Sequence, residues 1–241
     1  MCVAGLQERA LPAVPAKVAD RSDAKARRAF SLIELLVVIA IIALLAGLTV
    51  PVFRGIVGSG RVPAAANQIA SMLEFARNEA MTRQTYVWVA FDNVKDSNNS
   101  YELRMAAFAS DDGSTAGTPR QLSRMVNLPE VALIPFNGLK SATKSLLSAE
   151  GGSPVSVADS SESVRFLVRG QPLKRVLTFT PRGEALLTID PQPETTFDRT
   201  LDVSVKFLRA GKSPSDVDAS PDDATVLANG SSGRVDVLYL R

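Results

Sequence analysis

The chain has 241 residues, 46% of them hydrophobic, and its formal net charge is only +2. It has no histidine and one cysteine, Cys2, so an internal disulfide is excluded and the commonest metal ligand and general base are missing. The small net charge provides no overall basic field for nucleic acid. We therefore expect no catalytic site, metal or cofactor in this chain.

Residues 1–29 contain no continuous apolar run. They carry six basic and three acidic residues, which gives this segment a net charge of +3. Basic residues beside an apolar span remain on the cytoplasmic side of a membrane. The charge distribution therefore predicts that the residues after the span lie on the opposite side.

An apolar run extends from Phe30 to Val52, and residues 35–52 include no charge. As a helix, these 23 residues are about 35 Å long, enough to cross a hydrocarbon core of about 30 Å. We interpret the run as a transmembrane helix. A cleaved secretory signal peptide, a plain signal anchor and a buried helix of a soluble protein are the alternatives.

Glu34 lies near the start of this run. A carboxylate at the edge of hydrocarbon costs free energy, so an ionisable residue in such a span is a candidate functional site. The alternative is a side chain that reaches to the lipid headgroups. The question that decides between these interpretations is which group neutralises Glu34.

The segment from Ala29 to Ile42 resembles the class III signal of type IV pilins and type II secretion pseudopilins. The resemblance implies that prepilin peptidase removes residues 1–29 by cleaving between Ala29 and Phe30, and that Phe30 is then N-methylated. Glu34 becomes the fifth mature residue, as in the family, and Pro51 takes the place of a helix-kinking proline. One position differs, because Ala29 stands where the family has glycine.

Cleavage would leave a positively charged amine on Phe30, which the Glu34 carboxylate of a neighbouring subunit can pair with. Each charge alone is poorly solvated in a membrane or filament, and the two stabilise each other at low dielectric. A subunit in the wrong register would leave both charges unpaired. Residues 30–53 are therefore expected to act as the transmembrane and assembly helix.

Residues 54–84 are predicted to form a hinge followed by an amphipathic helix. Pro51 lacks an N–H, so the first helix should bend or break near Thr49, and glycines at 55, 58 and 60 favour a loosened segment up to Pro63. Helix should resume after Pro63 and continue to about Arg83. Its apolar stripe, interpreted as core, consists of Ala65, Ile69, Met72, Leu73, Ala76 and Ala80.

The remaining residues, 85–241, are predicted to form a β-rich domain. Strands are expected at residues 85–91, 101–108, 131–136, 164–168, 175–180, 185–189, 201–208 and 234–240. Loops rich in Ser, Gly, Asp and Pro are expected at 110–119, 148–163 and 210–233. The predicted fold class is α+β, with a long N-terminal helix packed on an antiparallel sheet.

Three short segments of this domain resemble minor pseudopilin H and the FimT-type minor pilins. They are the helical segment Ala76–Arg83, the F-x-P-x-G hairpin within Leu177–Gly183, and the closing strand that begins at Ser232–Val235. The resemblance implies a structural subunit of a type II secretion pseudopilus or type IV pilus-like filament, with a periplasmic domain. Its partners would be other pilin or pseudopilin subunits, prepilin peptidase and the inner membrane. Residues 108–163 match no motif of the family.

DNA binding during uptake, as in FimT-like minor pilins, is the alternative function. It needs a basic surface, for which the sequence offers Arg165, Arg169, Lys174, Arg175 and Arg182. Phosphate contacts by these residues would make binding depend on salt. The simpler interpretation is a solvated strand edge, where Lys and Arg oppose aggregation.

A calcium site was the remaining candidate among the sequence patterns. Asp216, Asp218, Asp222 and Asp223 could supply oxygen ligands, as a calcium loop does in the major pseudopilin. Their spacing fits no established loop, and we interpret them as a solvated acidic loop.

Overall fold

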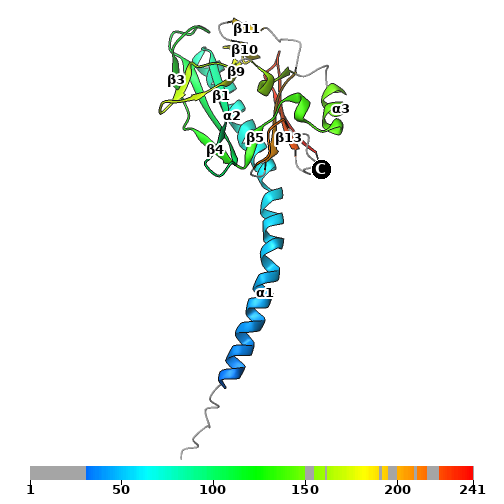
Figure 1. Ribbon diagram of the computed structural model, residues 1–241. Helices are drawn as coiled ribbons and strands as arrows, with labels where there is room; N and C mark the ends of the chain where they lie inside the picture. The colour runs from blue at the N-terminus through cyan, green and yellow to red at the C-terminus, as the bar shows by residue number, and fades with distance from the viewer. Residues whose placement is uncertain are drawn as a thin grey trace, which may run out of the picture. The chain divides into compact units, whose positions relative to one another are not determined.

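The computed structural model describes residues 31–149, 155–160, 162–189, 192–194, 200–208, 211–215 and 223–240. The predicted leader, with Ala29 and Phe30, lies outside these residues. The chain forms two compact units, residues 1–49 and residues 50–241. Helix α1 (Leu32–Ser59) and helix α2 (Arg61–Arg83) follow each other with only Gly60 between them. Both helices are visible in Figure 1.

The backbone of α1 remains helical through Pro51, so the predicted break near Thr49 is wrong. A proline removes one N–H from the helical ladder and crowds the carbonyl four residues before it, which can kink a helix without ending it. The loosened hinge predicted for residues 54–63 is also wrong, because all of these residues except Gly60 are helical. The first helix reaches Ser59, and the second begins at Arg61, two residues before Pro63.

Helix α2 confirms the predicted amphipathic helix. Its buried residues are Val62, Ala65, Ala66, Ile69, Ala70, Leu73, Ala76 and Ala80, which recur at helical spacing. The helix ends at Gln84, whose φ of 51° lies in the left-handed region and whose N–H donates to the carbonyl of Ala80. Met72, predicted as part of the buried stripe, is only half-buried.

The first sheet has the strand order β11-β10-β9-β1-β2-β3, with β4 also paired to β2, and all its pairs are antiparallel. Its strands are β1 (Val87–Lys95), β2 (Tyr101–Ser110), β3 (Pro119–Gln121), β4 (Val126–Pro129), β9 (Arg175–Phe179), β10 (Ala185–Ile189) and β11 (Gln192–Glu194). Strands β3 and β4 together form one outer edge of this sheet.

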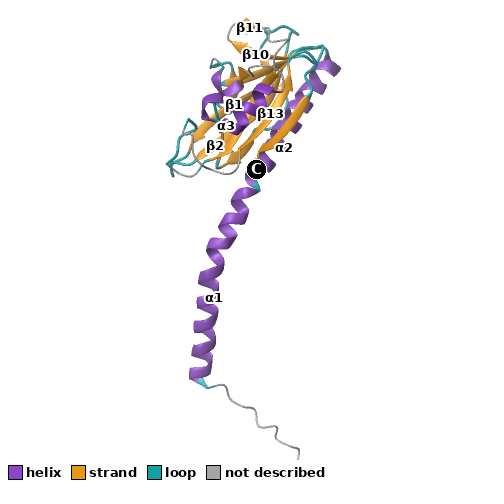
Figure 2. Cartoon of the chain, turned by 90° about the vertical axis from the view of Figure 1, so that its right-hand side faces the viewer, coloured by secondary structure: helices purple, strands orange, loops and turns teal. Residues whose placement is uncertain are grey.

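The second sheet has the order β14-β13-β12-β5, and the short β6 lies parallel to β12. Its strands are β5 (Val131–Leu133), β6 (Val155–Ser156), β12 (Thr200–Phe207), β13 (Asp223–Asn229) and β14 (Val235–Leu240). A separate hairpin joins β7 (Phe166–Val168) to β8 (Gln171–Leu173). Figure 2 shows the strands and the helices of this domain in separate colours.

Helix α2 contacts strands of both sheets, so one apolar core unites them. That core includes Ile69 and Leu73 of the helix, Val89 of β1 and Val203 of β12, all fully buried. On the opposite face of the first sheet, the β7–β8 hairpin covers a smaller cluster around Trp88. Burial of these side chains is the main source of stability, as the lack of disulfides predicts.

The structure shows the fold of residues 108–149, 155–160 and 162–163, a stretch that no sequence motif explained. They contain β3 to β6, the 3₁₀ turns Phe136–Gly138 and Val157–Asp159, and helix α3 (Ser141–Ala149). Leu139 and Leu147 pack against Leu227 of β13, so part of this segment covers the outer face of the second sheet. The sequence did not predict α3, because four serines and threonines in nine residues weaken its apolar pattern.

The loop predicted for residues 210–233 is wrong in its second half, where β13 is a central strand between β12 and β14. Residues Asp223 to Ala228 are all buried, including the polar Asp223 and Thr225, so burial on this strand does not alternate from one residue to the next. Central strands covered on both faces lose that alternation. The fold class itself, α+β with an antiparallel sheet domain, is confirmed.

Candidate functional site

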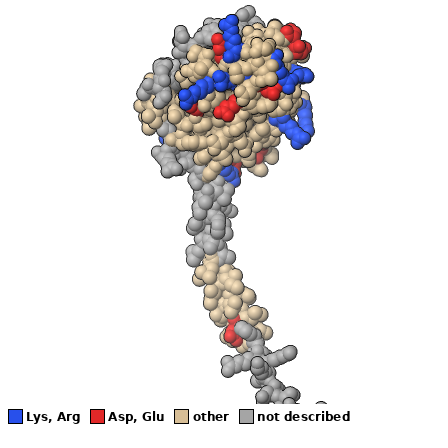
Figure 3. Space-filling model, turned by 180° about the vertical axis from the view of Figure 1, so that it is seen from behind, with Lys and Arg blue, Asp and Glu red and all other residues tan. Residues whose placement is uncertain are grey.

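The described side chains at the start of α1 form an exposed aliphatic surface. Every residue from Ser31 to Leu45 is exposed, and Leu32, the most exposed of the large apolar ones, has 81% of its surface accessible. Figure 3 shows this part of the chain as almost entirely uncharged. A contiguous apolar surface of this kind marks an interaction site.

Glu34 is the acidic residue in the first turn of α1. A carboxylate in this position is favoured by the unpaired N–H groups and the positive end of the helix dipole. Phe30 and Ala29 lie outside the described residues, as do the side chains of residues 46–59, including Pro51. Processing at Ala29, methylation at Phe30, pairing of Glu34 and a kink at Pro51 stay predictions.

Among the residues that the structure describes, no helix has the length and apolar character needed to cross a membrane.

The five cations proposed for DNA binding do not form one free basic surface. Lys174 and Arg175 both pair with Glu162, each at 3.5 Å. Arg169 and Arg182 lie in two different turns, one between β7 and β8 and the other between β9 and β10. In the view of Figure 3, basic and acidic side chains are interspersed over the domain.

Arg165 has a structural role within the domain. Its guanidinium donates hydrogen bonds to the carbonyls of Thr115, at 3.1 Å, and Ala116, at 2.9 Å, and also to Gly117. It also lies over the ring of Trp88, 5.7 Å from its centroid. This side chain therefore fixes the loop between β2 and β3 and has few donors left for a ligand.

The three segments that resemble the family converge at one place in the domain. Arg77 of α2 donates from Nε to the carbonyl of Gly183, at 3.4 Å, in the turn between β9 and β10. Gly233, in the turn between β13 and β14, lies directly against this carbonyl: a Cβ at Gly233 would be 1.9 Å from the Gly183 oxygen. The N–H of Ala185 also donates to the carbonyl of Gly230, at 2.9 Å. We call the contact of Arg77, Gly183 and Gly233 the glycine junction.

The glycine junction ties the helix to both sheets, because each turn belongs to a different sheet. Gly183 and Gly233 both have positive φ, at 83° and 61°, a conformation that glycine adopts without strain. The sequence showed the glycines but not their contact, since they are 50 residues apart and belong to separate hairpins.

Asp202 is a fully buried carboxylate on β12. The hydroxyl of Ser204 donates to its Oδ2 at 2.9 Å, whereas its Oδ1 has no hydrogen-bond partner within the described residues. Burial raises the pKa of Asp202 to about 6, against the lowering effect of Ser204 and the nearby Ser156, and Asp159 adds a smaller repulsion. At neutral pH the fold therefore contains an ionised carboxylate that it solvates poorly.

The raised pKa predicts a pH-dependent stability. Folding favours the protonated acid, so the contribution of Asp202 is fully present below about pH 4 and is lost as pH rises through about 6. The loss is about 3 kcal/mol for a shift of roughly two units. Urea unfolding of wild type and Asp202→Asn at pH 4.5 and 7.5 measures it. Between these two pH values the difference between the two proteins should change by about 2 kcal/mol, because the unfolded carboxyl is already mostly ionised at pH 4.5. A constant difference would contradict the prediction.

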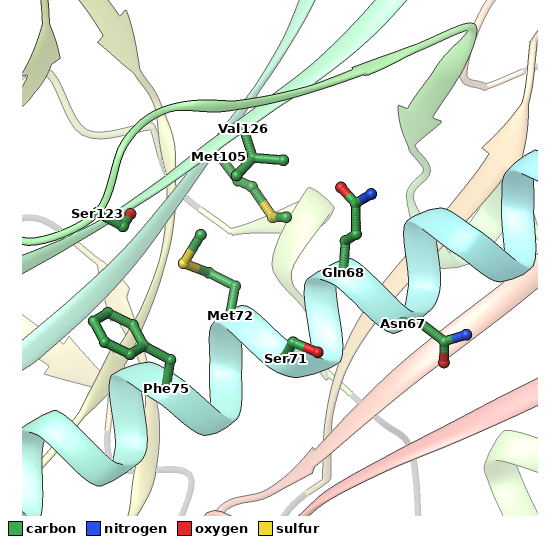
Figure 4. A pocket seen from close by; sticks show the side chains of 8 residues that line it. All are labelled: Asn67, Gln68, Ser71, Met72, Phe75, Met105, Ser123 and Val126. Atoms are coloured by element: carbon green, nitrogen blue, oxygen red, sulfur yellow. The ribbon is translucent and has the colours of Figure 1, made fainter.

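Two hollows lie on opposite faces of the first sheet. An apolar groove of about 490 Å³ lies between α2 and the β2–β4 edge, and Figure 4 shows its side chains. Its lining residues are Asn67, Gln68, Ser71, Met72, Phe75, Met105, Ser123 and Val126. The other hollow, about 520 Å³, is lined by Gln121, Arg124, Met125, Asn127, Val168 and Arg169. The first is uncharged and the second is basic.

Within the described residues, no group of three His, Cys, Asp or Glu side chains could hold a metal ion. Asp216, Asp218 and Asp222, considered above for calcium, lie outside the described residues. Asp223 does not belong to a solvated loop as predicted, because it is buried at the start of β13.

Two family models match the chain. The family model described as Type II transport protein GspH matches residues 65–238, and the model described as Prokaryotic N-terminal methylation motif matches residues 24–50. No curated protein matches the chain. Among solved structures, the type IV minor pilin FimU of Pseudomonas aeruginosa is similar at 14% identity and a TM-score of 0.34. The match covers 74% of this chain and 89% of that one.

The resemblance to pilins and pseudopilins inferred from the sequence is thus confirmed. The match over residues 65–238 covers well over half of the chain and includes all three parts of the glycine junction. The methylation motif covers Glu34 and the exposed aliphatic residues of α1. The chain belongs to the type II transport protein GspH family and is a pilin-like structural subunit.

Proposed function

We propose that the chain is a minor pseudopilin-like subunit of a type II secretion pseudopilus or a related filament. The observation that carries this proposal is the position of Glu34 in the first turn of a helix with exposed aliphatic residues on all sides. Residues 30–53 would anchor the chain in the inner membrane with the domain in the periplasm. The same residues would later pack against other subunits in the filament.

The assembly contact is an ion pair between subunits. Glu34 of one subunit would accept a charge-assisted hydrogen bond from the terminal amine of Phe30 in its neighbour. In an apolar surrounding, an unpaired carboxylate and an unpaired ammonium each carry a large desolvation penalty, so only the register that joins them is stable. The aliphatic residues hold neighbouring helices together by packing that allows many registers. The ion pair selects one register among them.

Processing between Ala29 and Phe30 is a direct test of the proposal. With a prepilin peptidase present, the N-terminal peptide of the mature chain is expected to begin at N-methylated Phe30, as read by peptide mass spectrometry. The Ala29→Gly variant should be processed at the same bond, and Ala29→Lys should remain uncut. A mature chain that retains Met1 in assembled filaments would refute this step.

DNA binding during uptake has less support than filament assembly. Arg165 is bound to backbone carbonyls, and Lys174 and Arg175 are paired with Glu162. These contacts leave two of the five proposed cations, Arg169 and Arg182, without a carboxylate or carbonyl partner for the side chain in the described part of the chain. They lie in separate turns and do not make a continuous phosphate-binding track.

A further inference from the structure

The turn at the tip of the β7–β8 hairpin contains an unusual residue. Val168 pairs with Gln171, so Arg169 and Gly170 form a two-residue turn, with φ of 52° and 80°. Two positive φ values identify the turn pattern that favours Asn, Asp or Gly at its first central position. Arginine has neither the missing Cβ of glycine nor the short polar side chain of Asn and Asp, so its backbone is strained in the left-handed region. Such strain is often found at functional sites.

Arg169 shares its hollow with a second arginine from a distant part of the chain. Arg124, in the segment between β3 and β4, lines the same hollow of about 520 Å³. Both side chains are exposed, and neither makes a hydrogen bond or ion pair within the described residues. Arg104, by contrast, is held by Glu102 and by Gln171 of the hairpin. Two unpaired guanidinium groups at one hollow favour an anionic ligand.

The wall of the hollow is a sheet edge. Gln121 and Asn127 belong to β3 and β4, which pair only with β2 and form the outer edge of the first sheet. A free edge offers backbone N–H and C=O groups to an added strand, and side-chain amides can hydrogen-bond to peptide groups as well. Met125 and Val168 add apolar surface beside the two arginines.

We propose that this hollow binds an extended peptide segment with acidic side chains, supplied by a partner protein. Arg124 and Arg169 form ion pairs with carboxylates of the peptide. The β3–β4 edge forms backbone hydrogen bonds with the peptide, as an added strand would. A peptide is favoured over nucleic acid because the six lining residues include no aromatic side chain on which bases could stack. This site is independent of the contact between Glu34 and Phe30.

The test uses the full-length chain in detergent micelles and fluorescence anisotropy. The probe is a fluorescein-labelled peptide of alternating Glu and Val, and its Gln–Val counterpart reports the contribution of charge. Only the acidic peptide should bind, and its affinity should fall as salt rises. Arg169→Gly and Arg124→Ala should each weaken binding by about tenfold or more. Arg182→Ala, an exposed arginine in another turn, should leave it unchanged.

Arg169→Gly also separates binding from folding. Glycine suits a φ of 52° better than arginine, so the melting temperature of this variant should be equal to or above that of wild type. Inorganic phosphate and a dT12 oligonucleotide serve as competitors. Stronger binding of the oligonucleotide than of the acidic peptide would overturn the proposal in favour of nucleic acid. Equal binding of the Gln–Val peptide, full affinity in Arg169→Gly, or no binding by wild type would each overturn it outright.

Discussion

The Glu34→Ala variant is expected to remain in the membrane but to enter filaments at least about a hundredfold less than wild type. Removing one member of a buried ion pair leaves the other charge unpaired, at a cost of about 3–5 kcal/mol. Membrane insertion should persist, because the aliphatic residues of α1 are untouched and the change removes a charge from the span. Sheared filaments and membrane fractions from cells that express the other subunits give the two quantities by immunoblot.

The matched control for this variant is Glu74→Ala, which removes an exposed carboxylate from α2, outside the aliphatic part of α1. It should assemble as wild type. Glu34→Gln should fail like Glu34→Ala, since the amide keeps the shape but cannot neutralise the amine. Filaments that contain the Glu34→Ala subunit at the normal level would show that the carboxylate does not determine register.

The second large effect is expected at the glycine junction, where Gly233→Ala should destabilise the domain by about 2–4 kcal/mol. The φ of 61° costs an L-residue about 1 kcal/mol, and the new methyl group would lie 1.9 Å from the carbonyl oxygen of Gly183. The clash is with backbone, so it is relieved only by moving the two turns apart, at a further cost typical of overpacking, about 1–3 kcal/mol. Urea unfolding of the chain in detergent, followed by tryptophan fluorescence, measures the change.

Gly113→Ala is the control that isolates backbone strain from the clash. Gly113 has a φ of 74°, but a Cβ there would have no atom within 4 Å. This variant should lose only about 1 kcal/mol. If both variants lose the same stability, the close approach of the two turns is not a constraint on the fold.

The order of elements was largely predictable from the sequence, because the relevant patterns are local. The stripe from Ala65 to Ala80 predicted α2, and alternating or β-branched runs predicted β1, β2, β9, β10 and β12. The predictions failed where burial depends on distant partners. Strand β13 was read as a loop, since its core position follows only from its pairing with β12 and β14.

The candidate sites divide in the same way. Glu34 could be found without a structure, since a single carboxylate beside a long aliphatic run is visible in the sequence itself. The five cations considered for DNA binding do not form one free surface. Their proximity in sequence did not show that Glu162 pairs with two of them and that backbone carbonyls bind a third. Arg124 was not predicted as a site residue, because it is distant from Arg169 in the sequence and the two line one hollow only in the folded domain.

The class of protein follows from patterns of contiguous residues, namely the aliphatic run, Glu34 within it and the helix that follows. Two features follow only from the folded domain: how the two sheets are joined, and which cations remain available. Both depend on contacts between residues far apart in the chain, such as Gly183 with Gly233 and Arg165 with the loop at Thr115. Local periodicity reports which face of an element is buried, but not which side chains meet there.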